Sequence, residues 1–180
     1  MRLNNKIALV TGAGSGFGRG IAARFAEEGA KVVVADINEK SAKKVAGEIG
    51  DSAIAVVADV SKNSDVEAMI QQSVAQWGRL DILVNNAGTT HRNKPMTEVT
   101  EEEFDRIFAV NVKSVFLTAR HGVPLMKEQG QGVILNVAST AGLRPRPGLA
   151  WYNTSKGAMI TATKAMAIEL ASFKIRVNAI

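Results

Sequence analysis

The sequence predicts a single α/β domain built on a doubly wound parallel sheet. Short apolar segments alternate with amphipathic segments along all 180 residues. The apolar segments are nearly continuous, as in strands that are buried on both faces. Regular strand–helix alternation with right-handed crossovers places helices on both sides of such a sheet. Because no repeat or linker interrupts the pattern, residues 1–180 are expected to form one domain.

Six segments have the composition of buried strands. They are residues 6–10, 31–36, 53–59, 80–86, 132–139 and 174–180. The carboxyl ends of parallel strands meet at one edge of the sheet, where open α/β proteins bind their ligands. The longest irregular segments, 87–99 and 139–148, both follow strand ends. We therefore expect these two segments to border a ligand site.

Five segments between the strands have helical periodicity. They are residues 17–28, 39–49, 64–77, 100–121 and 149–171. Gly29 and Gly50 follow the first two helices and are suited to their C-terminal caps. Capping boxes are predicted at 64–67 and 100–103, where Ser or Thr precedes Glu by three residues. Pro124 is expected to kink or end the fourth helix.

Composition excludes several classes of function. The chain has no cysteine, so it has neither disulfides nor thiolate metal sites, and we expect it in the reducing cytoplasm. No apolar run is long enough for a signal peptide or a membrane span. The net charge of +5 comes from scattered basic residues, which predicts no nucleic-acid partner. His91 and His121 are too isolated for a metal site, and we interpret both as surface or satisfied residues.

A glycine-rich turn joins the first strand to the first helix. Its pattern is Thr11-Gly12-x-x-x-Gly16-x-Gly18, which is neither the G-x-G-x-x-G fingerprint nor a P-loop. Glycine lets the backbone turn tightly and approach a ligand, and the helix N-terminus offers free N–H groups to phosphate. The turn therefore predicts a nucleotide cofactor.

Asp36, at the end of the second strand, indicates which nucleotide cofactor the chain prefers. A carboxylate at this position accepts hydrogen bonds from ribose hydroxyls and repels a 2′-phosphate. No basic residue occupies position 15 or 37, since these are Ser15 and Ile37. The pattern favours NAD over NADP. The glycines with Asp36 and Asp59 would also suit S-adenosylmethionine, so a methyltransferase remains a remote alternative.

Tyr152 is the only tyrosine of the chain, and Lys156 lies four residues later. This spacing places both side chains on one face of the last predicted helix. An ammonium near a phenol favours the phenolate and so eases proton transfer. Ser139, at the end of the fifth strand, can reach the same site and hydrogen-bond a carbonyl oxygen. A methyltransferase has no use for these three side chains.

Together, the glycine turn, "NNAG" at 85–88, Asn111, Ser139 and the Tyr152-x-x-x-Lys156 pair resemble the short-chain dehydrogenase/reductase family in its compact form. The resemblance covers the whole chain and implies a Rossmann-like fold. It implies that NAD(H) exchanges a hydride with an alcohol or ketone. The family's set of cofactor contacts maps onto Gly12, Ser15, Gly16, Phe17, Gly18, Asp36, Ile37, Asp59, Val60, Asn86, Gly88, Tyr152 and Lys156.

The resemblance also implies a role for each catalytic residue. Tyr152 is the general acid or base, and Lys156 favours its phenolate and binds the nicotinamide ribose. Ser139 holds the substrate oxygen. Asn111 supports a water that relays protons to Lys156. No metal takes part.

Family members continue past the "RVNAI" at the end of this sequence into a lid over the substrate and a last strand. An alternative is therefore a cofactor-binding fragment or scaffold without turnover. The resemblance further implies a homodimer or homotetramer that packs through helices 100–121 and 149–171. His91 and Arg92 follow the fourth strand, and Arg144 and Arg146 follow the fifth. Their charge favours an anionic substrate, although an ordinary solvated role explains them equally well.

Overall fold

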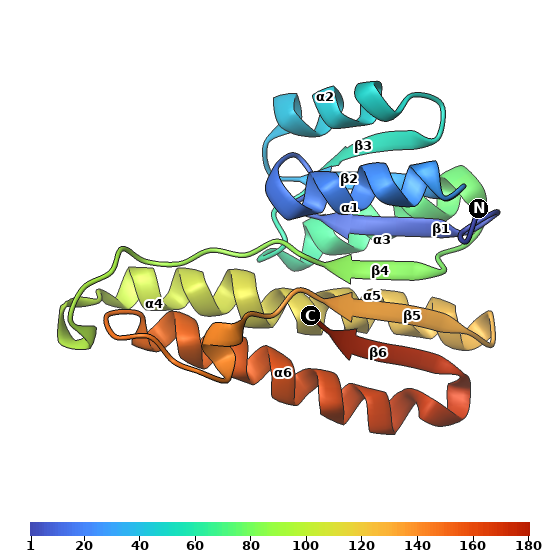
Figure 1. Cartoon of the computed structure of the whole chain (residues 1–180). Helices are drawn as coiled ribbons and strands as arrows, with labels where there is room; N and C mark the ends of the chain where they lie inside the picture. Colours follow the sequence, from blue (N-terminus) through green and yellow to red (C-terminus); the bar gives the residue numbers. More distant parts are fainter.

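The computed structural model describes all residues 1–180 and contains one sheet of six parallel strands in the order β3-β2-β1-β4-β5-β6 (Figure 1). The strands are β1 (Ile7–Thr11), β2 (Lys31–Asp36), β3 (Ala53–Val57), β4 (Ile82–Asn85), β5 (Gly132–Asn136) and β6 (Ile175–Ala179). The predicted doubly wound sheet is confirmed. The order of the strands reverses between β1 and β4, which is the usual place for a ligand in this architecture.

Helices cover both faces of the sheet. They are α1 (Gly16–Glu27), α2 (Glu39–Ile49), α3 (Asn63–Trp77), α4 (Glu101–Phe108), α5 (Ser114–Glu128) and α6 (Ala150–Leu170). Buried side chains of α1 and α2 form one core cluster with β1 and β2, while those of α3, α5 and α6 form a second cluster on the opposite face. These two cores explain why the central strands are apolar along their whole length.

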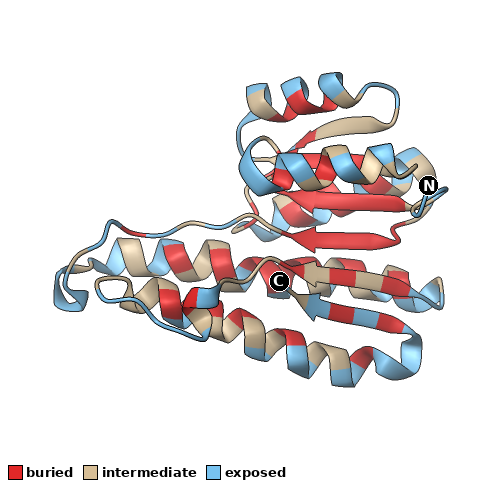
Figure 2. Ribbon diagram, viewed as in Figure 1, coloured by how far each residue is buried: buried red, intermediate tan, exposed pale blue.

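Burial decreases from the centre of the sheet toward its edge. Strands β1 and β4 are buried throughout, whereas β6 alternates between buried and exposed residues (Figure 2). Ile175 and Val177 face the core, and Arg176 and Asn178 are exposed. Strand β6 is thus an edge strand with one covered face.

The two predicted capping boxes have different outcomes. At the start of α4, the Thr100 hydroxyl accepts from the Glu103 N–H, and the Glu103 carboxylate accepts from the Thr100 N–H, as predicted. The box at Ser64 and Glu67 is wrong, because α3 begins at Asn63 without a side-chain cap. The carboxylate of Asp65 instead accepts from the N–H of Asp59, so it ties the helix start to the end of the β3 segment.

The long helix predicted over 100–121 is neither continuous nor ended by Pro124. A π-helical turn (Ala109–Lys113) separates α4 from α5, and α5 continues through Pro124 to Glu128. Proline removes one helical hydrogen bond. Packing of Met126, which is fully buried in the core, holds the last turn in place.

The carboxyl edge of the sheet carries the long irregular segments. One follows β4 and contains the short 3₁₀ helix Met96–Glu98, and the other follows β5 and contains Thr140–Gly142. Both extend beyond the same edge, near which the chain also ends at Ile180 (Figure 1). No helix of the chain is both long enough and apolar enough to span a bilayer.

Candidate active site

The glycine turn lies at the carboxyl end of β1, where the strand order reverses. Gly12 and Gly16 have φ angles of +62° and +54°, a region that favours glycine. A Cβ on Gly18 would overlap the carbonyl oxygen of Gly12 and the side-chain amide of Asn86. Ser15 precedes α1 with extended backbone and makes no side-chain cap. The first-turn N–H groups of α1 therefore lack a side-chain acceptor, which suits a phosphate.

Asn86 clamps this turn to β4. Its side-chain amide donates to the carbonyls of Thr11 (2.8 Å) and Gly12 (3.1 Å). The N–H groups of Asn86 and Ala87 both donate to the Thr11 hydroxyl, which donates to the carbonyl of Val84. Sequence reasoning placed Thr11 in the motif but did not assign it this function. The clamp fixes the turn without help from a ligand.

The Asp36 carboxylate lies against the glycine turn. One oxygen accepts from the N–H of Gly14 and the other from the N–H of Asn38, each at 2.9 Å. The neighbouring Ile37 is 68% exposed. The structure thus holds Asp36 at the second strand end, next to the expected position of an adenosine ribose.

Asp59 and Val60 lie at the end of the third strand segment. Partial burial alone would raise the pKa of Asp59, but hydrogen bonds from the Ser61 hydroxyl and N–H hold it below its ordinary value. Val60 is buried. These residues share the edge with the turn and Asp36, so the adenosine-side set is gathered along three neighbouring strand ends.

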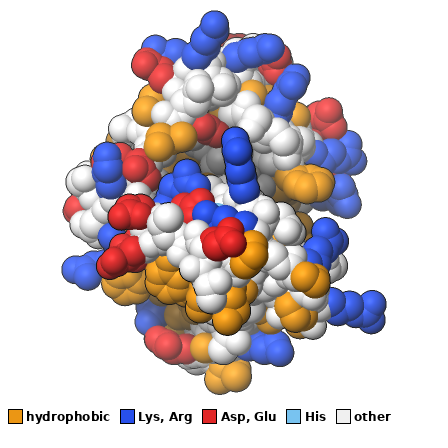
Figure 3. Space-filling view, turned by 90° about the vertical axis from the view of Figure 1, so that its left-hand side faces the viewer, with side chains coloured by type: hydrophobic (Ala, Val, Ile, Leu, Met, Phe, Trp, Pro, Cys, Tyr) orange, Lys and Arg blue, Asp and Glu red, His pale blue; other side chains and the backbone are white.

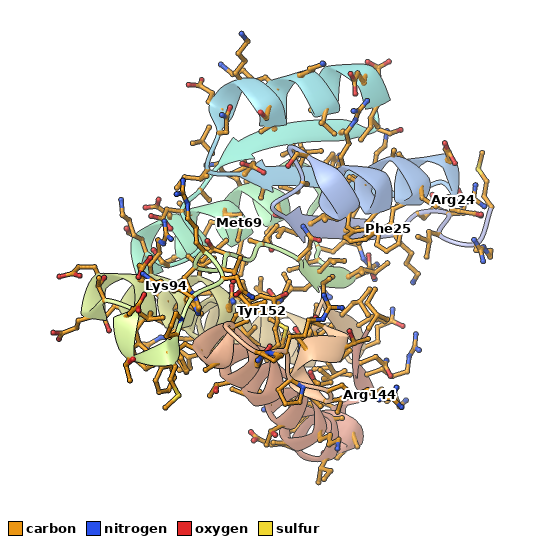
Figure 4. The ribbon with its side chains drawn as sticks, turned by 60° about the vertical axis from the view of Figure 1, so that its left-hand side comes forward. Arg24, Phe25, Met69, Lys94, Arg144 and Tyr152 are labelled. Carbon is orange, nitrogen blue, oxygen red and sulfur yellow. The ribbon has the colours of Figure 1, made fainter.

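A cavity of about 870 Å³ adjoins the turn and is lined by three of the four predicted catalytic residues, all but Asn111. Ser139, Tyr152 and Lys156 line it together with Asn86, Gly88 and Phe17 of the predicted cofactor set. Figure 3 looks onto this edge of the sheet and shows a recess across the middle of the face, with basic side chains beside it. Tyr152 lies centrally at this edge (Figure 4). The other predicted cofactor residues lie outside the cavity, on the adenosine side.

Lys156 is held beneath Tyr152. It is only 4% exposed, and its ammonium donates to the carbonyl of Val137 at 2.8 Å. The nitrogen lies 5.9 Å from the centre of the Tyr152 ring. Burial lowers the pKa of Lys156 to about 8. The Tyr152 hydroxyl has no protein partner, so it remains available to a molecule in the cavity.

Ser139 performs a structural task at the same place. Its hydroxyl oxygen accepts from the N–H of Ala141 at 3.1 Å and so caps the 3₁₀ helix Thr140–Gly142. The hydroxyl hydrogen is given to no protein atom. Ser139 can therefore cap this segment and still donate to a substrate oxygen.

Asn111 lies in the π-helical turn and is completely buried. Its side-chain oxygen accepts from the Thr89 N–H, and its amide donates to the Thr89 carbonyl and the Ser155 hydroxyl, all within 2.8–2.9 Å. Ser155 in turn donates to the carbonyl of Tyr152. The side chain of Asn111 thus joins the segment after β4 to the helix turn that carries Tyr152. Sequence reasoning did not identify Thr89 or Ser155.

A chain of buried hydrogen bonds lies beneath the cavity. Thr118 of α5 donates to Asn85, whose amide donates to Asn136, whose amide donates to Thr163 of α6, each at 2.8 Å. Thr163 donates to the carbonyl of Met159. Asn85 belongs to the "NNAG" motif, and the sequence shows the other residues only as polar positions at a strand end and inside helices, so their mutual contact could not be predicted.

The two histidines differ from each other. His121 contacts the side chain of Asn63, as expected for a satisfied residue. For His91 the expectation is wrong, because it is 3% exposed and its Nε2 atom has no partner. Its Nδ1 atom contacts the carbonyl of Arg92, so the turn after β4 folds the ring inward. Neither histidine belongs to a cluster that could hold a metal ion.

The fold and the cavity define a class: a Rossmann-like α/β protein with a glycine-rich turn beside a phenol, an ammonium and a hydroxyl. The family model described as "short chain dehydrogenase" matches residues 6–180. The chain belongs to the short-chain dehydrogenase/reductase family, which is a family of oxidoreductases.

Individual relatives agree with this assignment. The chain is 51% identical over its full length to 4-formylbenzenesulfonate dehydrogenase TsaC1/TsaC2 of Comamonas testosteroni, of which it covers 73%. The crystal structure of 3-ketoacyl-(acyl-carrier-protein) reductase from Brucella melitensis, complexed with NADH, is 55% identical with a TM-score of 0.97, over 98% of this chain and 75% of that one. NAD⁺-bound xylitol dehydrogenase is 35% identical with a TM-score of 0.96, over 99% and 70% of the chains.

Proposed function

We propose that this protein transfers a hydride between NAD(H) and a small alcohol or ketone, with Tyr152, Lys156, Ser139 and Asn111 as its catalytic set. The observation that carries the proposal is the shared cavity, in which Tyr152, Lys156 and Ser139 face the same space as Asn86 and Gly88. Carbonyl reduction requires a proton donor, a hydroxyl that binds the carbonyl oxygen and space for a cofactor that donates the hydride.

The residues present fit a dinucleotide. A Cβ at Gly12 or Gly18 would run into protein atoms, whereas one at Gly16 would meet nothing within 4 Å, so the backbone of the turn forms a cradle that is open at Gly16. The free N–H groups at the start of α1 suit the pyrophosphate, and Asp36 suits the adenosine ribose. When bound, the nicotinamide supplies or accepts the hydride. We infer a preference for NAD because Ile37 offers no positive charge to a 2′-phosphate.

The protein's own part is to move a proton and hold the substrate. During reduction, the Tyr152 hydroxyl gives its proton to the carbonyl oxygen, and the reverse transfer accompanies oxidation. The nearby Lys156 ammonium stabilises the phenolate that remains. Ser139 donates a hydrogen bond to the same substrate oxygen and fixes its distance from Tyr152.

Asn111 acts as a positioning residue next to the proton path. A Cβ placed on Gly88 would lie 3.5 Å from both the Asn111 side-chain oxygen and the Lys156 nitrogen. The two polar groups therefore approach Gly88 from the same side, and polar groups placed in this way can share a bridging water. We infer that a water there passes protons between Lys156 and solvent, and that Asn111 holds it.

We also infer that the protein associates through α5 and α6. A groove of about 580 Å³ between these helices is lined mainly by apolar side chains, including Val115, Phe116 and Met166. Phe116 is 58% exposed, and Ile168 on α6 is 80% exposed. Contiguous exposed apolar surface of this kind is typical of an interface. Replacing Phe116 by Lys should shift the mass measured by analytical ultracentrifugation from a dimer or tetramer to a monomer.

The function is tested first by binding and then by turnover. The protein is titrated with NADH, NADPH and S-adenosylmethionine while tryptophan fluorescence is followed. Binding of NADH but not S-adenosylmethionine supports the proposal, and the reverse result supports a methyltransferase. A panel of ketones and alcohols is then assayed by nicotinamide absorbance. Tight NADH binding without hydride transfer to any compound would support a cofactor-binding scaffold instead.

A further inference from the structure

Arg146 brings a second positive charge to the catalytic cavity. It lines this cavity together with Tyr152 and Ser139. Lys156 is the other cationic residue of the lining, which contains no Asp or Glu. Because opposite charge is absent, the cavity has a net positive character before any cofactor binds.

The backbone around Arg146 is fixed in place. Proline on both sides, at 145 and 147, restricts the segment to extended conformations. The side-chain amide of Asn153 donates to the Arg146 carbonyl at 2.9 Å, and that of Asn93 donates to the Pro147 carbonyl at 3.0 Å. Asn153 is buried on α6 directly after Tyr152. The position of Arg146 is therefore tied to the helix that carries the proton donor.

The Arg146 guanidinium is free to bind a ligand. It forms no ion pair and no side-chain hydrogen bond with the rest of the chain, whereas the Lys156 ammonium already binds the Val137 carbonyl. A guanidinium presents a planar set of donors that matches the two oxygens of a carboxylate or sulfonate.

We infer that Arg146 determines substrate specificity by binding an anionic group, a carboxylate or a sulfonate, on the molecule whose carbonyl or carbinol faces Tyr152. This inference rests on the proposed oxidoreductase function and names its substrate class. Arg144, two residues earlier, carries the same charge but does not line the cavity, and its side chain points away from Tyr152 (Figure 4). It provides the matched control.

The test compares each anion with its neutral ester. Reduction of 4-formylbenzoate and its methyl ester, and of 3-oxobutanoate and its methyl ester, is measured with NADH at fixed ionic strength. We expect kcat/KM to be at least about fivefold higher for the acid in one pair or both, the size of a partly exposed charge-assisted contact. Arg146→Gln should abolish this preference and leave the esters within twofold, whereas Arg144→Gln should preserve it. Arg146→Lys should retain part of it.

Each contrary result has a different meaning for Arg146. Turnover of acids and esters at equal rates, or an equal effect of Arg144→Gln, would overturn the inference while leaving the oxidoreductase function intact. A uniform loss for all four compounds in Arg146→Gln, with weaker NADH binding, would assign Arg146 to the cofactor. If none of the four compounds is reduced, they are not substrates, the ketone and alcohol panel decides the proposed function, and competition of the benzoate and its ester for the NADH complex decides the role of Arg146. Equal affinities there would also overturn the inference.

Discussion

The two halves of the carboxyl edge build their sites in different ways. On the adenosine side, after β1, β2 and β3, the predicted cofactor contacts are backbone positions of the glycine turn and exposed residues such as Ile37, which is 68% exposed. On the catalytic side, after β4 and β5, the site depends on buried polar side chains that satisfy one another, such as Asn111 and Lys156. A turn made of backbone atoms can carry a side chain only where the side chain points away from the ligand and from neighbouring atoms. A group of buried polar side chains keeps its geometry through hydrogen bonds.

The comparison predicts its largest effect at Tyr152. Tyr152→Phe retains the ring and removes only the hydroxyl, so folding and NADH affinity should be preserved. The turnover number should fall by roughly 100-fold or more, the usual contribution of a positioned acid or base. Steady-state kinetics and an NADH titration measure the two effects separately. Turnover near the wild-type rate would show that the catalytic half does not use this phenol.

The cradle of the adenosine half is tested by adding one methyl group. Gly18→Ala would push a Cβ into the carbonyl of Gly12 and the amide of Asn86, so we expect a loss of about 1–3 kcal/mol in urea unfolding and weaker NADH binding. Gly20 lies two residues later in the same helix, and the Cβ of Gly20→Ala would have no other atom within 4 Å. It should instead stabilise the helix by up to about 1 kcal/mol. Equal effects of both changes would contradict a specific cradle.

Lys156 should make stability depend on pH. Its pKa falls from an ordinary 10.5 to about 8 in the folded protein. Between these values the unfolded chain binds a proton that the folded protein has lost, so stability should rise as pH increases from 8 to 10.5. Below pH 8 the burial cost is fully present, on the order of 3 kcal/mol before its hydrogen bond is counted.

Lys156→Met removes that titration. The variant should lose turnover. Its urea midpoint should exceed that of the wild type by the largest amount near pH 7, and this difference should shrink toward pH 10. Cofactor-free protein is used for both, so that NADH does not contribute to stability. A constant difference across this pH range would mean that burial of the ammonium costs nothing.

The smallest effect concerns cofactor choice at Asp36. NADH should bind at least tenfold more tightly than NADPH, about 1.4 kcal/mol, because the carboxylate repels the 2′-phosphate. Asp36→Ala combined with Ile37→Arg should narrow or reverse this preference. The same variant should leave the turnover number with saturating cofactor within a fewfold, since the site of chemistry is in the other half. Equal affinity of the wild type for both nucleotides would remove the role given to Asp36.

Sequence reasoning succeeded where a signal is local. Buried strands are recognised by their composition, and the Thr100–Glu103 cap by its spacing, and both are confirmed. It failed at Pro124 and at the cap predicted for Ser64, where packing and a contact by Asp65 outweigh local preference. The π-helical turn at Asn111 was also not foreseen, because it has no sequence pattern of its own.

The residues of the candidate site also differ in whether a local sequence signal predicts them. Tyr152 and Lys156 could be paired from their spacing on one helix. The contacts of Asn111 with Thr89 and Ser155 join residues 22 and 44 positions apart, and no local pattern encodes such pairs. The carbonyl of Val137, which binds Lys156, is equally invisible in the sequence because any residue supplies a carbonyl.

The hydrogen-bond chain from Thr118 to Thr163 has a consequence for how the molecule opens. It links helix α5, the ends of β4 and β5, and helix α6 through buried side chains. Separating either helix from the sheet would leave buried amides without partners, at a cost comparable to the bonds themselves. These four elements should therefore exchange their amide hydrogens as one cooperative unit, slower than α2, which packs at the other end of the sheet. The catalytic half would then lose its order only in a single step.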